Sequence, residues 1–217
     1  MTRGVFLTFE GVEGAGKSTN LAAVREHLEK NSVDLLVTRE PGGTQIAEGI
    51  RTLLLQPHDE SMAAKAELLL MFAARVQHLQ EVIRPALARG TWVLCDRFTD
   101  ATYAYQGGGR GVDPTVIATL EALVHGDLQP DLTLYYDLAP EMGLQRHGEQ
   151  RSLDRIERET LAFHTRVRSA YIERARLAKG RILIVDAARP LAEVIQESLA
   201  LIDAWRVERR VATASPL

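Results

Sequence analysis

The chain has 217 residues, of which 46% are apolar and 25% charged, as expected for a globular protein with a buried core. Its 26 basic and 29 acidic residues give a net charge of −3, which disfavours a protein dedicated to binding double-stranded nucleic acid. The single cysteine, Cys95, excludes an intramolecular disulfide and a zinc site built on cysteines. We find no apolar run near the ~20 residues that span a bilayer and no secretory signal, so we expect a cytoplasmic protein without membrane or nucleic-acid partners.

Short apolar runs alternate with helical patterns along the chain, which predicts an α/β fold. Strands are expected at 5–9, 35–38, 92–95, 132–136 and 182–185. Helices are expected at 18–31, 44–55, 63–89, 114–125, 154–178 and 190–205, and a short helix is expected to begin at Pro140. We expect residues 100–111 to form a polar, glycine-rich loop and the tail beyond 208 to be frayed. Strands separated by helices indicate a parallel sheet covered on both faces. Ligands bind beyond the carboxyl ends of such strands, so the residues that follow each strand are the candidate site.

The turn after the first strand contains a phosphate-binding motif. It reads Gly11-Val12-Glu13-Gly14-Ala15-Gly16-Lys17-Ser18, followed by Thr19, and it matches the P-loop pattern between a predicted strand and a predicted helix. The glycines let backbone N–H groups point at phosphate oxygens, and the helix N-terminus adds a positive dipole. Lys17 is expected to reach the β- and γ-phosphates of ATP, and the Ser18 hydroxyl to bind Mg²⁺. The alternative, a chance glycine-rich turn, fits the strand and helix context poorly.

No lysine is followed two residues later by aspartate, so the guanine-reading motif of GTPases is absent from the sequence.

The residues after the third predicted strand are candidates for metal and phosphate binding. Asp96 would hold Mg²⁺ or orient Lys17, and Arg97 would clamp an acceptor phosphate. The alternative is a surface ion pair of little energetic value.

Two further clusters contain residues able to recognise a nucleobase. Met71 and Arg75 share a helix face that Phe72 adjoins, so an apolar plate and an arginine could stack on and hydrogen-bond a base; core packing is the alternative. Thr102, Tyr105 and Gln106 belong to a polar loop in which the Thr and Gln side chains could read base edges, although the segment could equally be a flexible surface loop. Arginines that flank a short polar stretch, Arg146, Arg151 and Arg155, could close over a transferring phosphoryl group or line a solvated helix face.

Taken together, the motifs resemble those of the thymidylate kinases, in their bacterial form, over nearly the whole chain. The anchors are residues 9–19, then Thr38-Arg39-Glu40-Pro41-Gly42-Gly43-Thr44, Phe72-Ala73-Ala74-Arg75, Asp96-Arg97-Phe98, Ala104-Tyr105-Gln106-Gly107, Pro130-Asp131-Leu132-Thr133 and Leu153-Asp154-Arg155-Ile156-Glu157. The resemblance implies a single P-loop kinase domain over 1–217, with a five-stranded parallel sheet in three α/β/α layers and a small lid near 146–155.

The resemblance also implies an activity and a set of roles. The activity is transfer of the γ-phosphoryl group of MgATP to dTMP, giving ADP and dTDP for dTTP synthesis, by a homodimer packed through helices. The P-loop residues 11–19 would bind ATP. Arg39, Arg51 and Arg97 would line the dTMP phosphate site, Glu13 would contact the sugar, and Tyr105 would pack near its 2′ position. Arg75, Thr102 and Gln106 would read the thymine, which either Met71 or Phe72 would cover.

The resemblance implies that, in the bacterial form, a catalytic arginine comes from the lid. The lid here contains Arg146, Arg151 and Arg155, and Lys17 and Arg97 would be the other catalytic residues.

Two other functions remain open from the sequence. A kinase for another nucleotide or nucleoside would differ only in the base pocket. A P-loop module that binds ATP for signalling or assembly would lack an acceptor, and the acceptor-side arginines argue against it.

Overall fold

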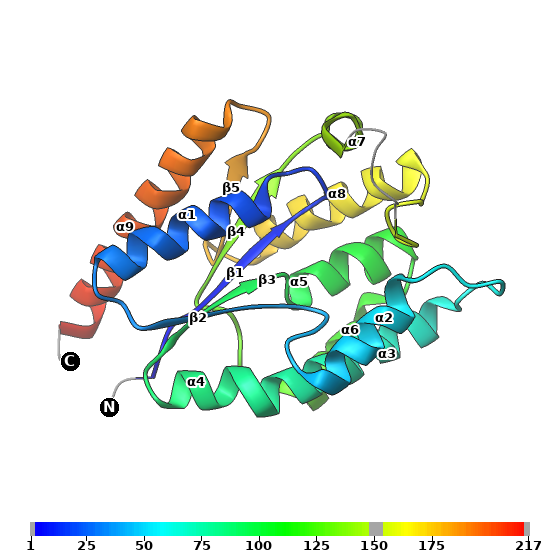
Figure 1. Ribbon diagram of the computed structural model, residues 1–217, viewed down its shortest axis with the longest axis horizontal. Coiled ribbons are helices and arrows are strands. Elements are labelled where there is room, and N and C mark those ends of the chain that lie inside the picture. Colours follow the sequence, from blue (N-terminus) through cyan, green and yellow to red (C-terminus); the bar gives the residue numbers. More distant parts are fainter. Residues whose placement is uncertain (1–2, 148–153, 215–217) are drawn as a thin grey trace.

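The computed structural model describes residues 3–147 and 154–214 (Figure 1). Five strands in these residues form one parallel sheet with the order β2-β3-β1-β4-β5. The strands are β1 (Phe6–Gly11), β2 (Leu35–Arg39), β3 (Trp92–Asp96), β4 (Leu132–Asp137) and β5 (Ile182–Asp186). The predicted three-layer α/β fold and all the predicted strands are confirmed, each to within two residues at its ends.

Helices connect the strands and cover both faces of the sheet. They are α1 (Lys17–Lys30), α2 (Gln45–Leu55), α3 (Ala64–His78), η1 (Leu79–Ile83), α4 (Arg84–Ala88), α5 (Thr99–Thr102), η2 (Tyr103–Gly109), α6 (Pro114–His125), α7 (Pro140–His147), α8 (Leu161–Leu177) and α9 (Leu191–Ala214). The helix expected over 63–89 is continuous except that its middle turn, η1, widens to π-helical geometry.

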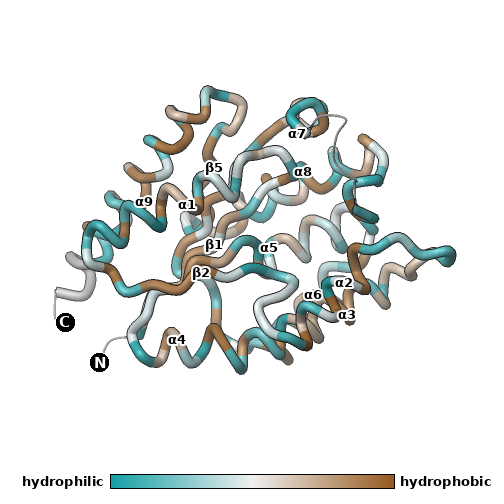
Figure 2. Tube along the Cα trace, in the orientation of Figure 1, coloured by the Kyte–Doolittle hydropathy of each residue, from teal (hydrophilic) through white to brown (hydrophobic). Residues whose placement is uncertain are grey.

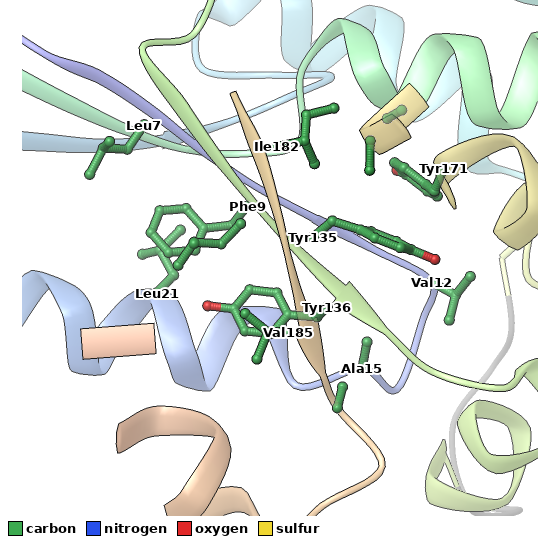
Figure 3. Close-up of a cluster of buried hydrophobic side chains, with 14 of the residues drawn as sticks. Leu7, Phe9, Val12, Ala15, Leu21, Tyr135, Tyr136, Tyr171, Ile182 and Val185 are labelled. Atoms are coloured by element: carbon green, nitrogen blue, oxygen red, sulfur yellow. The ribbon is translucent and has the colours of Figure 1, made fainter. Parts of the chain in front are cut away.

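Alternation along β1 divides the core into two sides. Leu7 and Phe9 face α1 and α9, which pack against each other on one side of the sheet (Figures 1 and 3). Phe6 faces the η1 and α4 side, where it packs in a buried cluster with Phe98. Tyr135 and Tyr171, stacked at 4.8 Å between ring centroids, join β4 to α8 on that same side (Figure 3). Helices thus pack on both faces of the sheet.

The register of the sheet brings the ends of three strands to one edge. Phe9 of β1 lies beside Asp96 of β3, and Arg39 of β2 lies beside Asp96 on its other side. Because parallel strands end at the same edge, the P-loop and the residues after β2 and β3 become neighbours in space.

Residues 100–111 were expected to form a loop, and this expectation is wrong. They continue α5 into the π-helical turn η2 and end in a short turn, and this segment packs closely on α8. The glycines serve that contact, since a Cβ on Gly108 would lie 2.6 Å from Ala170 Cβ, and one on Gly109 would lie 2.5 Å from the Phe163 ring. The run of glycines therefore reflects the close packing of two helices rather than a mobile loop.

Two helix ends also differ from the prediction. Residues 155–158 form a turn and α8 begins at Leu161, where the Thr160 hydroxyl accepts a hydrogen bond from the Phe163 N–H as an N-cap. The final helix does not fray at 208, because α9 extends to Ala214.

The hydropathy of the trace follows this layering, with apolar residues concentrated along the strands (Figure 2). Within the described residues, no helix combines the length and the apolar character needed to cross a lipid bilayer.

Candidate functional site

The P-loop curls around the start of α1 as its sequence predicts. Gly14 and Gly16 adopt positive φ angles of 75° and 79°, which side chains with a Cβ strongly disfavour. Lys17 is buried, and its Nζ donates a hydrogen bond to the Val12 carbonyl oxygen at 3.1 Å. Burial and the positive charge of Arg97 lower the pKa of Lys17, so the ammonium group gains free energy from any anion that enters.

A cavity of about 330 Å³ opens between the P-loop and the ends of β2 and β3. We call it the β3-side cavity. Its lining residues are Glu13, Lys17, Ser18, Arg39, Glu40, Pro41, Arg51, Leu54, Leu55, Met71, Asp96, Arg97, Ala101, Tyr105, Gln106, Asp154, Ile156, Glu157 and His164. The structure therefore brings most of the predicted acceptor-site residues to one place.

Three arginines converge on this cavity. Arg39 is half exposed and bound to Glu48 at 2.8 Å, while Arg51 donates to the Pro41 carbonyl oxygen at 2.9 Å. Burial lowers the pKa of Arg51, and the positive charges of Arg39 and Arg97 lower it further. Such crowding of like charge favours binding of an anion such as a phosphate.

Arg97 is held in an unusual backbone conformation directly after β3. Its φ angle is 68°, a left-handed value that is costly for a residue other than glycine and is typical of functional positions. Its guanidinium group donates to Glu13 Oε2 and to the Tyr171 hydroxyl, both at 3.3 Å, and lies 5.0 Å from the centre of the Tyr105 ring. These contacts direct the side chain toward the P-loop.

Glu10 braces the turn that contains Arg97. Its fully buried carboxylate accepts hydrogen bonds from the Phe98 N–H and the Tyr171 hydroxyl, each at 2.7 Å. Burial and the negative charge of Asp100 raise the pKa of Glu10 from 4.5 to about 7, against the opposing effect of Arg97. Glu10 thus connects β1, the turn after β3 and helix α8.

Asp96 and Ser18 provide oxygen atoms suited to a hard cation. Asp96 Oδ1 is buried and has no hydrogen-bond partner in the part of the chain that the structure describes, and Ser18 lines the same cavity. An unpartnered buried carboxylate oxygen beside a P-loop serine fits a magnesium ion that keeps most of its water ligands. Among the described residues, no group of three or more His, Cys, Asp or Glu side chains is arranged to hold a metal ion.

Arg75 is buried at the back of the site rather than on the wall of the β3-side cavity. Its Nε donates to Glu40 Oε2 at 2.6 Å and its Nη2 to the Thr102 hydroxyl at 3.0 Å. Burial would raise the pKa of Glu40, but the charge of Arg75 and a hydrogen bond from His78 lower it. Arg75 Nη1 is buried with no partner among the described residues and remains able to donate to a ligand.

The structure separates the two candidates for covering a base. Met71 lines the β3-side cavity, whereas Phe72 is buried in an apolar cluster with Leu68 and Ile117. Phe72 therefore contributes to the core beneath Arg75, whose guanidinium carbon lies 4.9 Å from its ring centre. The predicted substrate-binding role falls to Met71 in this arrangement.

The predicted lid arginines are not brought together. Arg146 donates to the Ala187 carbonyl oxygen at 3.0 Å, and Arg155 donates to Glu67 Oε2 at 2.6 Å and to the Leu54 carbonyl oxygen at 2.8 Å. Arg155 thus anchors the turn before α8 to α2 and α3, and its catalytic role stays a prediction. Arg151 lies outside the described residues.

A second cavity, of about 530 Å³, lies on the opposite side of the P-loop beside the end of β5. We call it the β5-side cavity. Its lining residues are Gly14, Ala15, Gly16, Thr19, Asn20, Arg146, Ala187, Ala188, Arg189, Pro190, Leu191 and Val194. Residues 187–191 were missed by our sequence analysis, although the carboxyl-end rule applied to the fifth strand would have indicated them.

Buried acids were also missed. Glu10 and Glu40 occur in the runs of residues on which the resemblance rests, and Glu67 lies directly before an apolar run, but the sequence analysis assigned no role to these three residues. Each is at most 4% exposed and accepts hydrogen bonds from site residues or their neighbours. A charged residue inside an apolar stretch was the available signal.

Ionisation of Glu10 should make the protein less stable as the pH rises. Because the folded pKa of about 7 exceeds the unfolded value of 4.5, the folded state binds more protons between these values. Between about pH 5 and about pH 8 this group should lower the free energy of unfolding by ~2–3 kcal/mol. The Glu10→Gln variant should lack this contribution, as measured by chemical denaturation across the pH range. Parallel pH profiles for the two proteins would contradict the assignment.

Comparisons with known proteins agree with this geometry. The family model described as Thymidylate kinase matches residues 9–198. A thymidylate kinase of Pseudomonas savastanoi pv. phaseolicola is 61% identical over 191 residues, covering 88% of this chain and 91% of that protein. One from Pseudomonas putida is 58% identical over 199 residues, covering 92% and 95%. The crystal structure of thymidylate kinase from Ehrlichia chaffeensis superposes with a TM-score of 0.73 at 31% identity, covering 92% of this chain and 99% of that one. The chain therefore belongs to the thymidylate kinase family.

Proposed function

We propose that the protein transfers the γ-phosphoryl group of ATP to dTMP, producing ADP and dTDP. The bond between the γ-phosphorus and its bridging oxygen breaks, and a dTMP phosphate oxygen forms the new bond. The observation that carries this proposal is that one cavity joins the P-loop lysine to Arg39, Arg51 and Arg97, with Gln106 further along its wall. A phosphate acceptor attached to a base fits this combination.

The β5-side cavity would receive the nucleoside part of ATP. It begins at the P-loop glycines and is bounded by Arg146 and the residues after β5. An ATP molecule that extends from there along the P-loop would place its γ-phosphate beside Lys17, at the border of the β3-side cavity. Arg146 would then contact the ATP side, which supports it over Arg155 as the lid arginine in this arrangement.

Magnesium would be held by Ser18 and Asp96, together with the phosphates of ATP. When bound, the ion would neutralise part of the phosphate charge. The chain's own task is to align two anionic substrates. A phosphate acceptor needs no general base, so Lys17 and Arg97 would act by positioning and by offsetting charge repulsion.

Two alternative functions predict different acceptor behaviour. A kinase for another nucleotide would share the P-loop and arginines but would require a base pocket other than the one formed by Met71, Arg75 and Gln106. A module that binds ATP without transferring phosphate would have no use for Arg97, which is partly buried and has a left-handed backbone conformation. The acceptor side therefore favours a kinase, and the family favours dTMP.

A substrate panel tests this function. We expect the purified protein with MgATP to release ADP rapidly with dTMP, more slowly with dUMP, and at background rates with dCMP, dGMP, UMP and AMP. Faster turnover with another monophosphate would show that dTMP is not the preferred substrate. ADP release at the same rate with and without an acceptor would contradict the kinase function.

Substitution of the charged groups tests the mechanism. Lys17→Ala or Arg97→Ala should lower kcat/KM for dTMP by at least ~10³-fold, equivalent to about 4 kcal/mol of transition-state stabilisation. Arg176→Ala serves as a control, because this arginine is exposed on α8 and bound only to the neighbouring Glu173 in the described contacts. A loss below tenfold in either site variant, measured by steady-state kinetics, would contradict the assigned roles.

The proposed homodimer would pack through α2, α3 and α6. These adjacent helices expose several large apolar side chains, namely Ile46, Leu53, Leu69, Val76, Val116 and Leu123. Burial of such side chains against a second copy of the chain would stabilise a dimer by the hydrophobic effect.

The wild-type protein is therefore expected to sediment at twice the mass of the chain, and Leu69→Asp at the mass of a monomer. Leu177→Asp, which changes an exposed leucine on α8, should leave the dimer intact. Analytical ultracentrifugation distinguishes these states, and a wild-type monomer at micromolar concentration would contradict the dimer.

A further inference from the structure

Glu67 is a buried acidic residue in the first half of α3, directly before the apolar run 68–74. Its side chain is 1% exposed. Its Oε1 accepts a hydrogen bond from Gln106 Nε2 at 2.8 Å, and its Oε2 accepts one from Arg155 Nη2 at 2.6 Å. Arg110 Nη2 lies 3.2 Å from the same Oε2. Glu67 therefore connects the π-helical turn η2, which carries Gln106, to α3 and to the turn before α8.

Neighbouring side chains stabilise the negative charge of Glu67. Burial would raise the pKa of its carboxyl group, but hydrogen bonds from Gln106 and Arg155 and the charge of Arg110 outweigh burial and lower that pKa. An ionised carboxylate has no proton to donate, so it can only accept hydrogen bonds.

This chemistry determines the orientation of the Gln106 side-chain amide. A carboxylate acceptor requires the amide NH₂ group on its side, so the carbonyl oxygen of Gln106 must point the other way. Gln106 lines the β3-side cavity, and its Oε1 is buried with no hydrogen-bond partner among the described residues. An unpartnered buried acceptor on a cavity wall indicates a ligand that donates a hydrogen bond there.

We propose that Glu67 is a positioning residue that fixes the Gln106 amide with its carbonyl oxygen toward the base, and thereby selects pyrimidines that carry a proton on N3. The inference rests on the proposed function, in which the β3-side cavity holds the nucleotide acceptor. Thymine donates from N3–H, whereas the N3 atom of cytosine is an acceptor and would face the Gln106 oxygen with two lone pairs opposed. Rotation of the amide by 180° would reverse this preference, and the Glu67 carboxylate opposes that rotation.

Selectivity between dTMP and dCMP provides the test. We would measure kcat/KM for both acceptors in the wild type and in Glu67→Gln, whose neutral amide can either donate to or accept from Gln106. The ratio of the two kcat/KM values should fall by about tenfold or more, as expected when a site that reads hydrogen bonds loses its fixed pattern. Most of the change for dTMP should appear as a higher KM, because the reacting phosphates lie elsewhere in the cavity.

A double-mutant cycle separates this role from a general structural one. Gln106→Met removes the acceptor oxygen and should also lower the selectivity. If Glu67 acts through Gln106, adding Glu67→Gln to Gln106→Met should change the selectivity no further. Glu121→Gln is a matched control, since Glu121 binds Tyr103 at the other end of the same helical segment and should leave the selectivity unchanged.

Failure of this inference can be distinguished from failure of the proposed function. A wild-type enzyme that uses dTMP and dCMP equally, a folded Glu67→Gln variant with wild-type selectivity, or additive effects in the double mutant would overturn the inference while leaving the kinase function intact. A wild type with no activity toward dTMP would instead defeat the proposed function. If Glu67→Gln does not fold, Glu67→Asp keeps a negative charge near Arg110 and Arg155 but shortens the side chain by one methylene group, which lengthens the contact with Gln106, and should lower the selectivity in the same direction.

Discussion

The parallel pairing of β1 with β3 is the constraint on which the site depends. It places Phe9 beside Asp96, so that the P-loop after β1 and the Asp96–Arg97 turn after β3 begin at the same edge of the sheet. Glu10 then joins the two turns through the Phe98 N–H. The position of Arg97 is therefore set by the sheet and its buried braces rather than by a free loop, as preorganised electrostatic stabilisation requires.

Buried carboxylates recur as supports for groups that face the ligand. Glu10 braces the turn of Arg97, Glu40 holds Arg75, and Glu67 holds Gln106. Removal of one partner from such a buried charged contact typically costs ~3–5 kcal/mol, because the other group stays desolvated. This cost limits how far the supported side chains can move, and it gives the cavity a defined pattern of donors and acceptors before any ligand arrives.

Much of this arrangement could be predicted from the sequence, because strands, helix periods and the P-loop are local patterns. The strand positions and the neighbours of Lys17 followed from those patterns and from the carboxyl-end rule. The helical form of residues 103–109 could not, since Gly108 and Gly109 are explained by the approach of α8, which is distant in the sequence. The contact between Arg155 and Glu67 could not be predicted either. The two residues are 88 positions apart in the sequence, and no local signal connects them.

In the proposed function, two substrates approach the P-loop from opposite sides, dTMP through the β3-side cavity and ATP through the β5-side cavity. A crystal structure of the protein with dTMP and a non-hydrolysable ATP analogue tests it most directly. We predict the dTMP phosphate at Arg97, its base beside Gln106, and the adenosine of the analogue beside Arg146. A structure with dTMP bound beside Arg146, or with the analogue's adenosine in the β3-side cavity, would contradict the account.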